Sequence, residues 1–206
     1  INGDASLIAF RVAKYSPKQN NRIILQPENS MYNMITIRQT RPEEISKLMP
    51  IFEQAKRIMR KSGNMKQWTG GYPNEELVRR DIENGHSYVC LDDAQEIIGT
   101  FSFIPGKDPT YARIYEGAWI DDVQPYATIH RLASTEASHG VAAACLDWCY
   151  RQIPNLRADT HRDNSILQHI LTKHGFTYCG IIYLMNGDER LAFQKCNMPK
   201  EQHTNV

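Results

Sequence analysis

The stretch Ile129–Cys145, IHRLASTEASHGVAAAC, decides the fold class of this chain. It predicts a strand that ends near Ser134, a short loop, and a helix that begins near Gly140. The first amides of a helix have no partner inside the helix, and with the helix dipole they form a site for anions. Gly140 lets the backbone approach a phosphate closely, although an ordinary tight connection also contains a glycine. The stretch therefore predicts a strand–loop–helix unit with room for a phosphate group.

A second stretch, Leu156–Gly180, reads LRADTHRDNSILQHILTKHGFTYCG. A short strand at Leu156–Thr160 precedes a helix at Asn164–His174, which Gly175 closes. Apolar side chains recur in this helix at inward-facing positions: Ile166, Leu167, Ile170 and Leu171. Strands and helices thus alternate from Ala127 onward, which indicates a mixed sheet with helices on both faces.

Together the two stretches resemble the conserved blocks of the GNAT (Gcn5-related N-acetyltransferase) superfamily. In the second block of that family, a strand leads to an asparagine, a helix, a Lys-x-Gly-Phe end and another strand, and Asn164, Lys173, Gly175 and Phe176 match this pattern. The family's acyl-CoA loop, Gln/Arg-x-x-Gly-x-Gly/Ala, resembles residues 137–142, ASHGVA. The two blocks occur in the same order as in the family, so the pair is more specific than either block by itself.

The resemblance covers Met34–Lys195 and implies a fold and an activity. The implied fold is an α/β (α+β) domain with a mixed, mostly antiparallel central sheet and helices on both faces. The implied activity is N-acetyl (acyl) transfer from acetyl-CoA, the co-substrate, to a primary amine by direct attack in a ternary complex. Such a reaction requires no metal and no covalent enzyme intermediate.

The resemblance also implies where acetyl-CoA binds. The strand before the loop splays from its neighbour, and the pantetheine arm lies in the gap, where Ser134 offers backbone groups. Asn164 is expected to meet the cofactor from the other side. The residues expected to bind the cofactor are Leu132, Ser134, Ser138, His139, Gly140, Val141, Ala142 and Asn164.

Two features depart from the family pattern. Ala137 occupies the usual Gln/Arg position in a loop that is shorter than in many relatives, but backbone amides carry most of the phosphate binding. Leu171 stands where many relatives have a tyrosine that acts as general acid on the thiolate. The acid is therefore elsewhere, or the thiolate leaves unassisted.

The attacking amine must be neutral, and an amine with a pKa near 10 needs a base. The first candidate is Glu116, which precedes Gly117-Ala118-Trp119 in an expected central strand; the alternative is a surface carboxylate. The second candidate is His130 on the strand before the loop, or else it is a hydrogen-bonded core histidine. Tyr183 is a candidate displaced acid, or an ordinary packed strand tyrosine.

Trp68 and Tyr72 lie in a glycine-rich segment and are the candidate residues for binding the acceptor. The alternative for Trp68 is that it covers the edge of the core. Because Leu171 replaces the tyrosine, a non-catalytic acyl-CoA-binding sensor or interaction module is the second candidate function. A purely structural domain is a third reading, which must treat both matching blocks as coincidence.

The chain divides into three parts: an appendage at residues 1–33, the acyltransferase domain at 34–196, and a tail at 197–206. Helices are expected after a Thr40/Glu43 capping box, at Pro73–Asn84, from Gly140 to Pro154, and at Asn164–His174. The expected strands are Met34–Arg38, Ser87–Leu91, Ile97–Ile104, Tyr111–Ile120, Ala127–Ala133, Leu156–Thr160, Thr177–Met185 and Arg190–Cys196.

Composition excludes several classes of partner. The 206 residues include 24 Lys and Arg against 23 Asp and Glu, so the basic excess of a nucleic-acid-binding protein is missing. No apolar run is long enough to cross a bilayer, and no secretory signal is recognised, so a cytoplasmic protein without membrane partners is expected. The expected partner is a small-molecule or peptide amine, and a homodimer remains open because many relatives are dimers.

The five cysteines form no CxxC pair, so neither a disulfide framework nor a zinc cluster is expected. Cys145 and Cys149 are spaced to share a helix face and are expected to be core residues. His161 lies between Asp159 and Asp163, but these carboxylates flank a helix start, where a capping role is common. No metal site is therefore expected.

Overall fold

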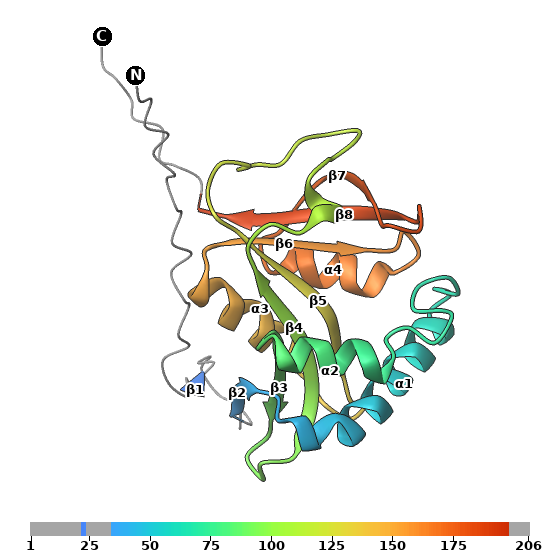
Figure 1. The fold of residues 1–206 in the computed structure, drawn as a ribbon, viewed down its shortest axis with the longest axis vertical. Coiled ribbons are helices and arrows are strands. Elements are labelled where there is room, and N and C mark those ends of the chain that lie inside the picture. Colours follow the sequence, from blue (N-terminus) through green and yellow to red (C-terminus); the bar gives the residue numbers. More distant parts are fainter. Residues whose placement is uncertain (1–21, 24–33, 198–206) are drawn as a thin grey trace, which may run out of the picture.

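The structure, a computed structural model, describes residues 22–23 and 34–197, which form one eight-stranded sheet with helices on both faces (Figure 1). The strands are β1 (Arg22–Ile23), β2 (Ile35–Gln39), β3 (Ser87–Leu91), β4 (Ile97–Pro105), β5 (Ala127–Ser134), β6 (Asn155–Thr160), β7 (Thr177–Tyr183) and β8 (Glu189–Cys196). The α-helices are α1 (Ile45–Lys61), α2 (Glu75–Glu83), α3 (Val141–Gln152) and α4 (Ser165–Lys173). Two 3-10 helices are η1 (Pro42–Glu44) and η2 (Pro109–Tyr111).

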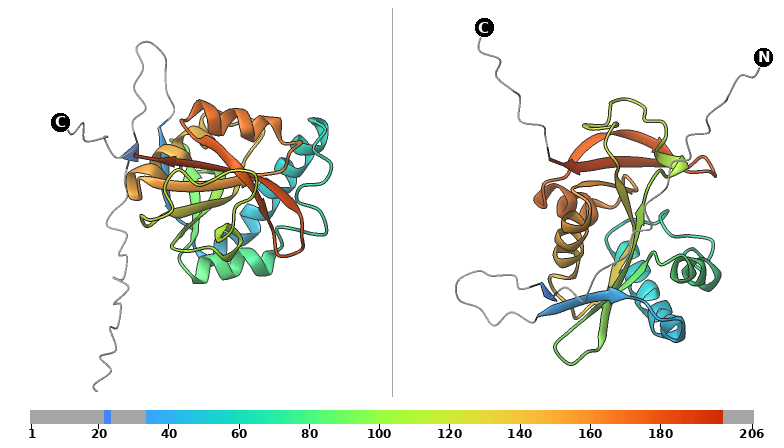
Figure 2. Two further views of the ribbon diagram at one scale, coloured as in Figure 1. Left: turned by 90° about the horizontal axis from the view of Figure 1, so that it is seen from above. Right: turned by 60° about the vertical axis from the view of Figure 1, so that its left-hand side comes forward.

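The sheet is mixed and mostly antiparallel, as the sequence predicts. Its strand order is β1-β2-β3-β4-β5-β6-β8-β7, and β5 with β6 is the parallel pair among the described strands. Helices α1 and α2 cover one face, while α3 and α4 cover the other (Figure 2). This arrangement confirms the predicted fold class and leaves the parallel pair in the middle, between the two helix layers.

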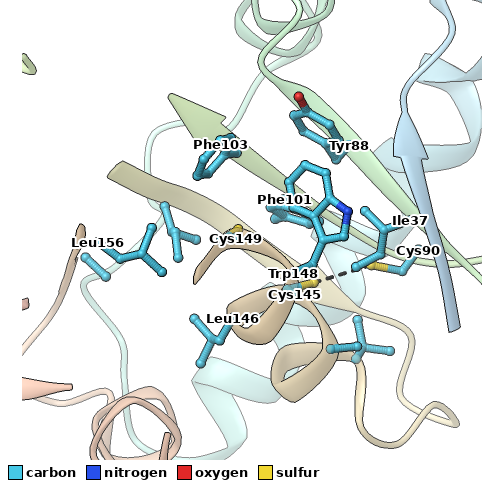
Figure 3. Packing of buried hydrophobic residues seen from close by; sticks show 14 of the residues in the cluster. Ile37, Tyr88, Cys90, Phe101, Phe103, Cys145, Leu146, Trp148, Cys149 and Leu156 are labelled. Carbon is cyan, nitrogen blue, oxygen red and sulfur yellow. Dashed lines mark hydrogen bonds between the residues drawn. The ribbon is translucent and has the colours of Figure 1, made fainter. Parts of the chain in front are cut away.

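The larger core lies between the sheet and α3, with Trp148 at its centre (Figure 3). The ring centroid of Trp148 lies 4.7 Å from Tyr88 and 5.6 Å from Phe103. Cys145 and Cys149 are fully buried here, which confirms them as core residues, and Sγ of Cys145 lies 3.3 Å from Sγ of Cys90. Close aromatic packing in this layer fixes α3 against the sheet and thereby fixes the start of α3 beside the end of β5.

A second core fixes α1 on the opposite face of the sheet. Leu48, Ile51 and Phe52 recur at helical spacing in α1, and they pack in one cluster with Val89 of β3 and Ala133 of β5. Ala133 is small, so α1 can lie close to the end of β5. The end of β5 is therefore held between α1 on one face and α3 on the other.

The expected strand at Tyr111–Ile120 is wrong. After η2 the chain is irregular, and only Tyr115 pairs with a strand, through reciprocal 2.8 Å hydrogen bonds to Ile181 of β7. The close approach depends on Gly117, because a Cβ at this position would lie 2.0 Å from the carbonyl oxygen of Cys179. The alternation of apolar and polar side chains in this segment does not show that it packs against the edge of β7, with Gly117 at the point of contact.

The connection to β5 is anchored to the sheet by polar side chains. The guanidinium of Arg157, 1% exposed, lies 4.0 Å from the ring centroid of Trp119 and 3.9 Å from that of Tyr126. Gln194 accepts a 2.6 Å hydrogen bond from the backbone N–H of Ile120. These contacts hold residues 119–126 over β6 and β8.

The predicted capping box at Thr40 and Glu43 is also wrong. The hydroxyl of Thr40 lies 2.8 Å from that of Ser87, and the box begins one residue later. There the carboxylate of Glu44 accepts a 2.8 Å hydrogen bond from the backbone N–H of Arg41, and it also pairs with Arg38 at 2.6 Å. An arginine on the neighbouring strand therefore selects which glutamate caps the helix.

Most of the expected appendage at residues 1–33 and of the tail at 197–206 lies outside the described residues. Within them, Arg22–Ile23 pairs antiparallel with β2, and the backbone N–H of Asn197 donates to the carbonyl of Pro154 at 3.2 Å. In residues 22–23 and 34–197, none of the helices has the length and apolar character needed to span a bilayer. The domain boundaries remain predictions.

Candidate active site

The central feature of the site is a gap between the parallel strands β5 and β6. Their pairing covers Ala127–Ile129 and ends where Ile129 meets Ala158. Strand β5 continues to Ser134, so its last five residues have no partner on the β6 side among the described strands. Backbone N–H and C=O groups on an unpaired strand edge bind an extended ligand well.

A β-bulge lies on β5 within this gap. Thr100 pairs with Ala133 and Ser102 with His130, so two residues of β5 lie opposite the single Phe101. One of them, Arg131, has a φ of 54°, which costs strain in a residue with a side chain. The bulge changes the alternation of faces, and the backbone of Arg131 and Leu132 leaves the regular ladder beside the gap.

A cavity of about 980 Å³ runs along the gap and reaches both faces of the sheet. Seven of the predicted site residues line it: Trp68, Tyr72, His130, Leu132, Ser134, Ala142 and Asn164. Its wall on the α3 and α4 side is apolar and includes Leu146, Leu167, Ile170 and Leu171. Its lining on the α1 and α2 side combines apolar side chains, among them Ile58, Met59 and Leu77, with the polar side chains of Asp81, Asp108, His130 and Arg131. No charged residue of α3 or α4 lines the cavity, and we call the region lined by its charged side chains the polar side.

The start of α3 forms one end of the site. Gly140 is the N-cap with a φ of 78°, and it gives the helix no side-chain cap. A Cβ at Gly140 would meet no atom within 4 Å, so the space beside it is open. His139 and Gly140 are exposed, and neither they nor Ser138 and Val141 line the cavity, although Ala142 does. An open, uncapped helix start with an exposed glycine is suited to an anion.

The loop before α3 is held in place by polar contacts. The hydroxyl of Thr135 lies 2.5 Å from that of Ser138. The backbone N–H of Glu136 donates to Oε1 of Gln54 at 3.1 Å, and its carboxylate pairs with Lys61 at 3.4 Å. The loop is thus tied to α1, which fixes its course past the start of α3.

Asn164 is the N-cap of α4 and joins two walls of the cavity. Its Oδ1 accepts a 3.1 Å hydrogen bond from the backbone N–H of Leu167. Its Nδ2 donates to Oε1 of Gln67 at 2.9 Å, and Gln67 accepts a second bond from Asn64 at 2.8 Å. Asn164 therefore ties α4 to the loop after α1, and a direct cofactor contact by its side chain remains a prediction.

His130 lies between two carboxylates on the polar side. Its Nε2 is 3.0 Å from Oδ2 of Asp108, and its Nδ1 is 3.8 Å from Oδ1 of Asp159. The edge of the ring packs against Tyr111, whose hydroxyl donates to Oδ1 of Asp159 at 2.6 Å. The side chain of His130 is 16% exposed and lines the cavity, so it is both oriented and accessible.

The carboxylate of Asp108 is fixed in its ionised form. Burial opposes its charge, but hydrogen bonds from His130 and from the hydroxyl and backbone N–H of Thr110 outweigh burial and lower its pKa to about 2. The bonds from Thr110 measure 2.6 Å and 2.9 Å. Asp108 is therefore a permanent acceptor that holds the imidazole in one orientation.

Arg131 connects the bulge to α2. Its guanidinium pairs with Asp81 at 2.6 Å, donates to the hydroxyl of Ser102 at 3.1 Å, and donates to the hydroxyl of Tyr72 at 3.2 Å. Burial lowers the pKa of Arg131, but Tyr72 and Asp81 raise it by a larger total amount. Because the oxygen of Tyr72 accepts from Arg131, its own proton is left for a ligand.

Trp68 both covers the core edge and lines the cavity, so the two readings of this residue are compatible. Its ring centroid lies 5.8 Å from Phe52 and 6.3 Å from Tyr72. The guanidinium of Arg60 donates to the carbonyls of Asn64, Gln67 and Trp68 and thereby holds the loop. Trp68 has a φ of 55°, a conformation that this clamp supports.

Glu116 and Tyr183 are outside the cavity. Glu116 is exposed in the irregular segment after η2, with a φ of 53°, and is not part of a central strand. Tyr183 ends β7, is 42% exposed, and packs against Tyr115 with ring centroids 5.2 Å apart. The structure therefore places His130 in the same cavity as four of the residues predicted to bind the cofactor, and it leaves Glu116 and Tyr183 elsewhere.

Leu171 is 1% exposed and belongs both to the core and to the apolar wall of the cavity. Helix α4 carries no tyrosine, so this wall offers no phenol. The sequence did not single out Asp81, Asp108 or Arg190, and it related Asp159 only to a helix start; all four line the polar side. Asp81 pairs with Arg131 and Asp108 with His130, residues far away in the chain, so local spacing does not reveal these contacts.

Within the described ranges, no three His, Cys, Asp or Glu side chains are grouped so that they could hold a metal ion. His161 lies 3.5 Å from the carboxylate of Asp163, which is 44% exposed. The backbone N–H of Asp163 donates to Nδ1 of the same histidine at 3.1 Å. These contacts stabilise the turn that connects β6 to α4.

A scan against protein-family models finds no match for this chain. A search of curated proteins finds no match either. Comparison with solved structures finds many matches. One is a GNAT-family acetyltransferase from Streptococcus agalactiae, with 35% sequence identity and a TM-score of 0.73 over 83% of this chain and 100% of the other.

Two further structures share the fold at lower identity. A GNAT-family acetyltransferase from Listeria monocytogenes has 18% identity and a TM-score of 0.62, over 85% of this chain and 99% of the other. A GNAT-family acetyltransferase from Bacillus cereus has 14% identity and a TM-score of 0.54, over 81% and 99%. With the splayed central strands, the glycine loop before α3 and the identity to the streptococcal protein, this chain belongs to the GNAT family of acetyltransferases.

Proposed function

We propose that this protein transfers an acetyl group from acetyl-CoA to a primary amine within a ternary complex. The observation that carries the proposal is the cavity in the gap between β5 and β6. It extends from Ala142 near the start of α3 to the pair formed by His130 and Asp108. The same cavity therefore lies next to the start of α3, which suits an anion, and next to His130, our candidate base.

The residues around the gap fit acetyl-CoA. The uncapped amides at the start of α3, with the open space beside Gly140, suit a pyrophosphate. The unpaired edge of β5 up to Ser134 suits an amide-bearing arm that bonds like an added strand. The apolar side chains of Leu167, Ile170 and Leu171 exclude water from this arm.

Acetyl-CoA supplies an acetyl group activated as a thioester: the amine nitrogen forms the new bond to the carbonyl carbon, and the carbon–sulfur bond breaks. The protein must remove one proton from the amine and stabilise negative charge on the carbonyl oxygen. The bulge at Arg131 and Leu132 leaves backbone groups outside the ladder, and a backbone N–H there is our candidate donor to the oxyanion.

His130 is our proposed base, and Asp108 is its positioning residue. The carboxylate accepts from Nε2 when that nitrogen carries a proton, which leaves Nδ1 as the acceptor for the proton of the amine. Asp159, 3.8 Å from Nδ1, stabilises the imidazolium that forms. Glu116 is exposed and outside the cavity, so we do not assign it this role.

The leaving thiolate has a pKa near that of an ordinary thiol, about 8.5, so it can leave without a strong acid. Helix α4 offers no tyrosine, and Leu171 forms an apolar wall. Tyr72 lines the cavity with a hydroxyl proton that is not used by Arg131, which makes it our candidate for protonating the thiolate.

The test is calorimetric titration with acetyl-CoA, followed by an assay of thiol release over amino acids, polyamines, aminoglycosides and lysine peptides. Saturable binding and acceptor-dependent thiol release are expected. Binding without release on any amine would favour the alternative, a non-catalytic acyl-CoA sensor. No binding in folded protein would overturn the proposed cofactor site.

A further inference from the structure

Arg190 of β8 is a buried cation on the wall of the cavity. Its side chain is 8% exposed, and it lines both the main cavity and a smaller adjoining hollow. Neither the cofactor site nor the proposed base uses it. A buried guanidinium is costly unless its N–H groups are well bonded, so its partners need to be accounted for.

The contacts of Arg190 use only some of its N–H donors. One terminal nitrogen donates to the carbonyl of its neighbour Glu189 at 2.8 Å, and the other lies 3.4 Å from Asp188, which is 51% exposed. Its Nε lies 3.8 Å from Oδ2 of Asp159, beyond hydrogen-bonding distance. A guanidinium has five N–H donors, so donors are left over for a ligand in the cavity.

Two of the four carboxylates that line the cavity, Asp81 and Asp108, are in contrast bonded at short distances. Asp81 is bonded by Arg131 at 2.6 Å and by Ser102 at 2.8 Å. Asp108 is bonded by His130 and Thr110, as described above. A polycationic acceptor would need unpaired carboxylates here, whereas Asp81 and Asp108 are already bonded and Arg190 still has N–H donors without a hydrogen-bond partner among the described residues.

Asp159 lies between Arg190 and the proposed base. Its Oδ1 is 3.8 Å from Nδ1 of His130, and its Oδ2 is 3.8 Å from Nε of Arg190. The base and the guanidinium therefore lie beside the same carboxylate, one near each of its oxygens. A ligand with an amine at His130 and an anion at Arg190 must carry these two groups close together.

Resting on the proposed function, we propose that the acceptor is an α-amino acid whose carboxylate binds Arg190 while its amine faces His130. A guanidinium binds a carboxylate through two parallel hydrogen bonds, which a lysine cannot reproduce. The amine transfers its proton to Nδ1 of His130 as the amide bond forms, and the thiolate leaves from the thioester.

The test compares acceptors that differ only at the carboxylate. Thiol release is measured with L-leucine, L-methionine, L-phenylalanine and L-glutamate, with their α-carboxamides, and with the decarboxylated amines. Each acceptor is used with the wild type and with Arg190→Lys. Arg162→Lys serves as the matched control, because Arg162 is 65% exposed and pairs with Glu189, the neighbour of Arg190.

We expect KM for the amino acids to rise roughly 10- to 100-fold in Arg190→Lys, the size of a lost hydrogen bond to a charged group. KM for the carboxamides should not change, and Arg162→Lys should behave as wild type. An effect that appears only when both Arg190 and the substrate carboxylate are present reports their direct contact and not a general change in the fold.

Three results overturn the inference, and they separate it from the proposed function. If amines are acetylated with no preference for a carboxylate, or if KM does not change in Arg190→Lys, the protein is still an acetyltransferase but its acceptor is not an α-amino acid bound by Arg190. Equal loss with amino acids and carboxamides means that Arg190 only supports the fold. Binding of acetyl-CoA without thiol release on any amine rejects the proposed activity itself, and the inference with it.

Discussion

Nε2 of His130 lies 3.0 Å from Oδ2 of Asp108, although the two residues are 22 positions apart in the chain. One is on the bulged strand β5 and the other precedes η2, so only the course of the connection between β4 and β5 brings them together. Both line the cavity, which makes this contact the structural basis of the proposed proton transfer.

We predict that His130→Gln lowers kcat by roughly 10²- to 10⁴-fold, the contribution of a positioned general base. Affinity for acetyl-CoA, measured by calorimetry, should be unchanged, because the start of α3 is not altered. Glu116→Gln is the informative comparison: if that variant loses turnover and His130→Gln does not, the exposed carboxylate is the base.

Asp108→Asn tests the same pair through stability. The pKa of Asp108 is lowered to about 2 from an ordinary value of 3.8, so its carboxylate stabilises the fold above pH 3.8 and this contribution is lost as the pH falls through about 2. The shift corresponds to about 2 kcal/mol. The free energy of unfolding, measured in urea, should be higher for the wild type than for the variant by about this amount near pH 5. The two values should converge near pH 2. A difference that does not depend on pH would contradict the assignment.

Gly140→Arg should abolish acetyl-CoA binding in calorimetry, because its side chain would fill the open space at the start of α3. Gly63→Arg is the matched control, since Gly63 also has a positive φ, of 87°, and open space around it, but lies at the end of α1. Both variants bear the same backbone strain. Equal affinity in the two folded variants would place the cofactor elsewhere.

Arg157→Met should reduce the free energy of unfolding by about 3 kcal/mol, from the loss of two desolvated cation–π contacts and a hydrogen bond to a carbonyl. Arg113→Met is the control, because the guanidinium of this exposed residue lies 4.7 Å from the ring centroid of Tyr115 at the surface. That control should lose less than about 1 kcal/mol. Chemical denaturation measures both, and equal losses would show that burial of Arg157 contributes little.

The boundaries of β3 and α4 show which structural features the local sequence predicts correctly. Strand β3 agrees with the prediction residue for residue, and α4 begins after Asn164 and ends before Gly175, as the capping signals indicate. These features depend on periodicity and on groups a few residues apart. The prediction of a strand at Tyr111–Ile120 was wrong because the conformation of this segment depends on packing across β7, which no local pattern encodes.

By itself the sequence determined the fold class and the glycine loop before α3, because both depend on short-range patterns. Its resemblance to GNAT enzymes indicated the family, and seven of the site residues expected from the sequence line the cavity. Only the tertiary structure decided that Glu116 is outside the site, that His130 meets Asp108, and that Arg190 faces the cavity with few partners. Those contacts depend on strand register, on the bulge at Arg131 and on the end of pairing at Ile129. Register and bulges follow from the packing of the whole sheet, which residues far apart in the chain determine jointly.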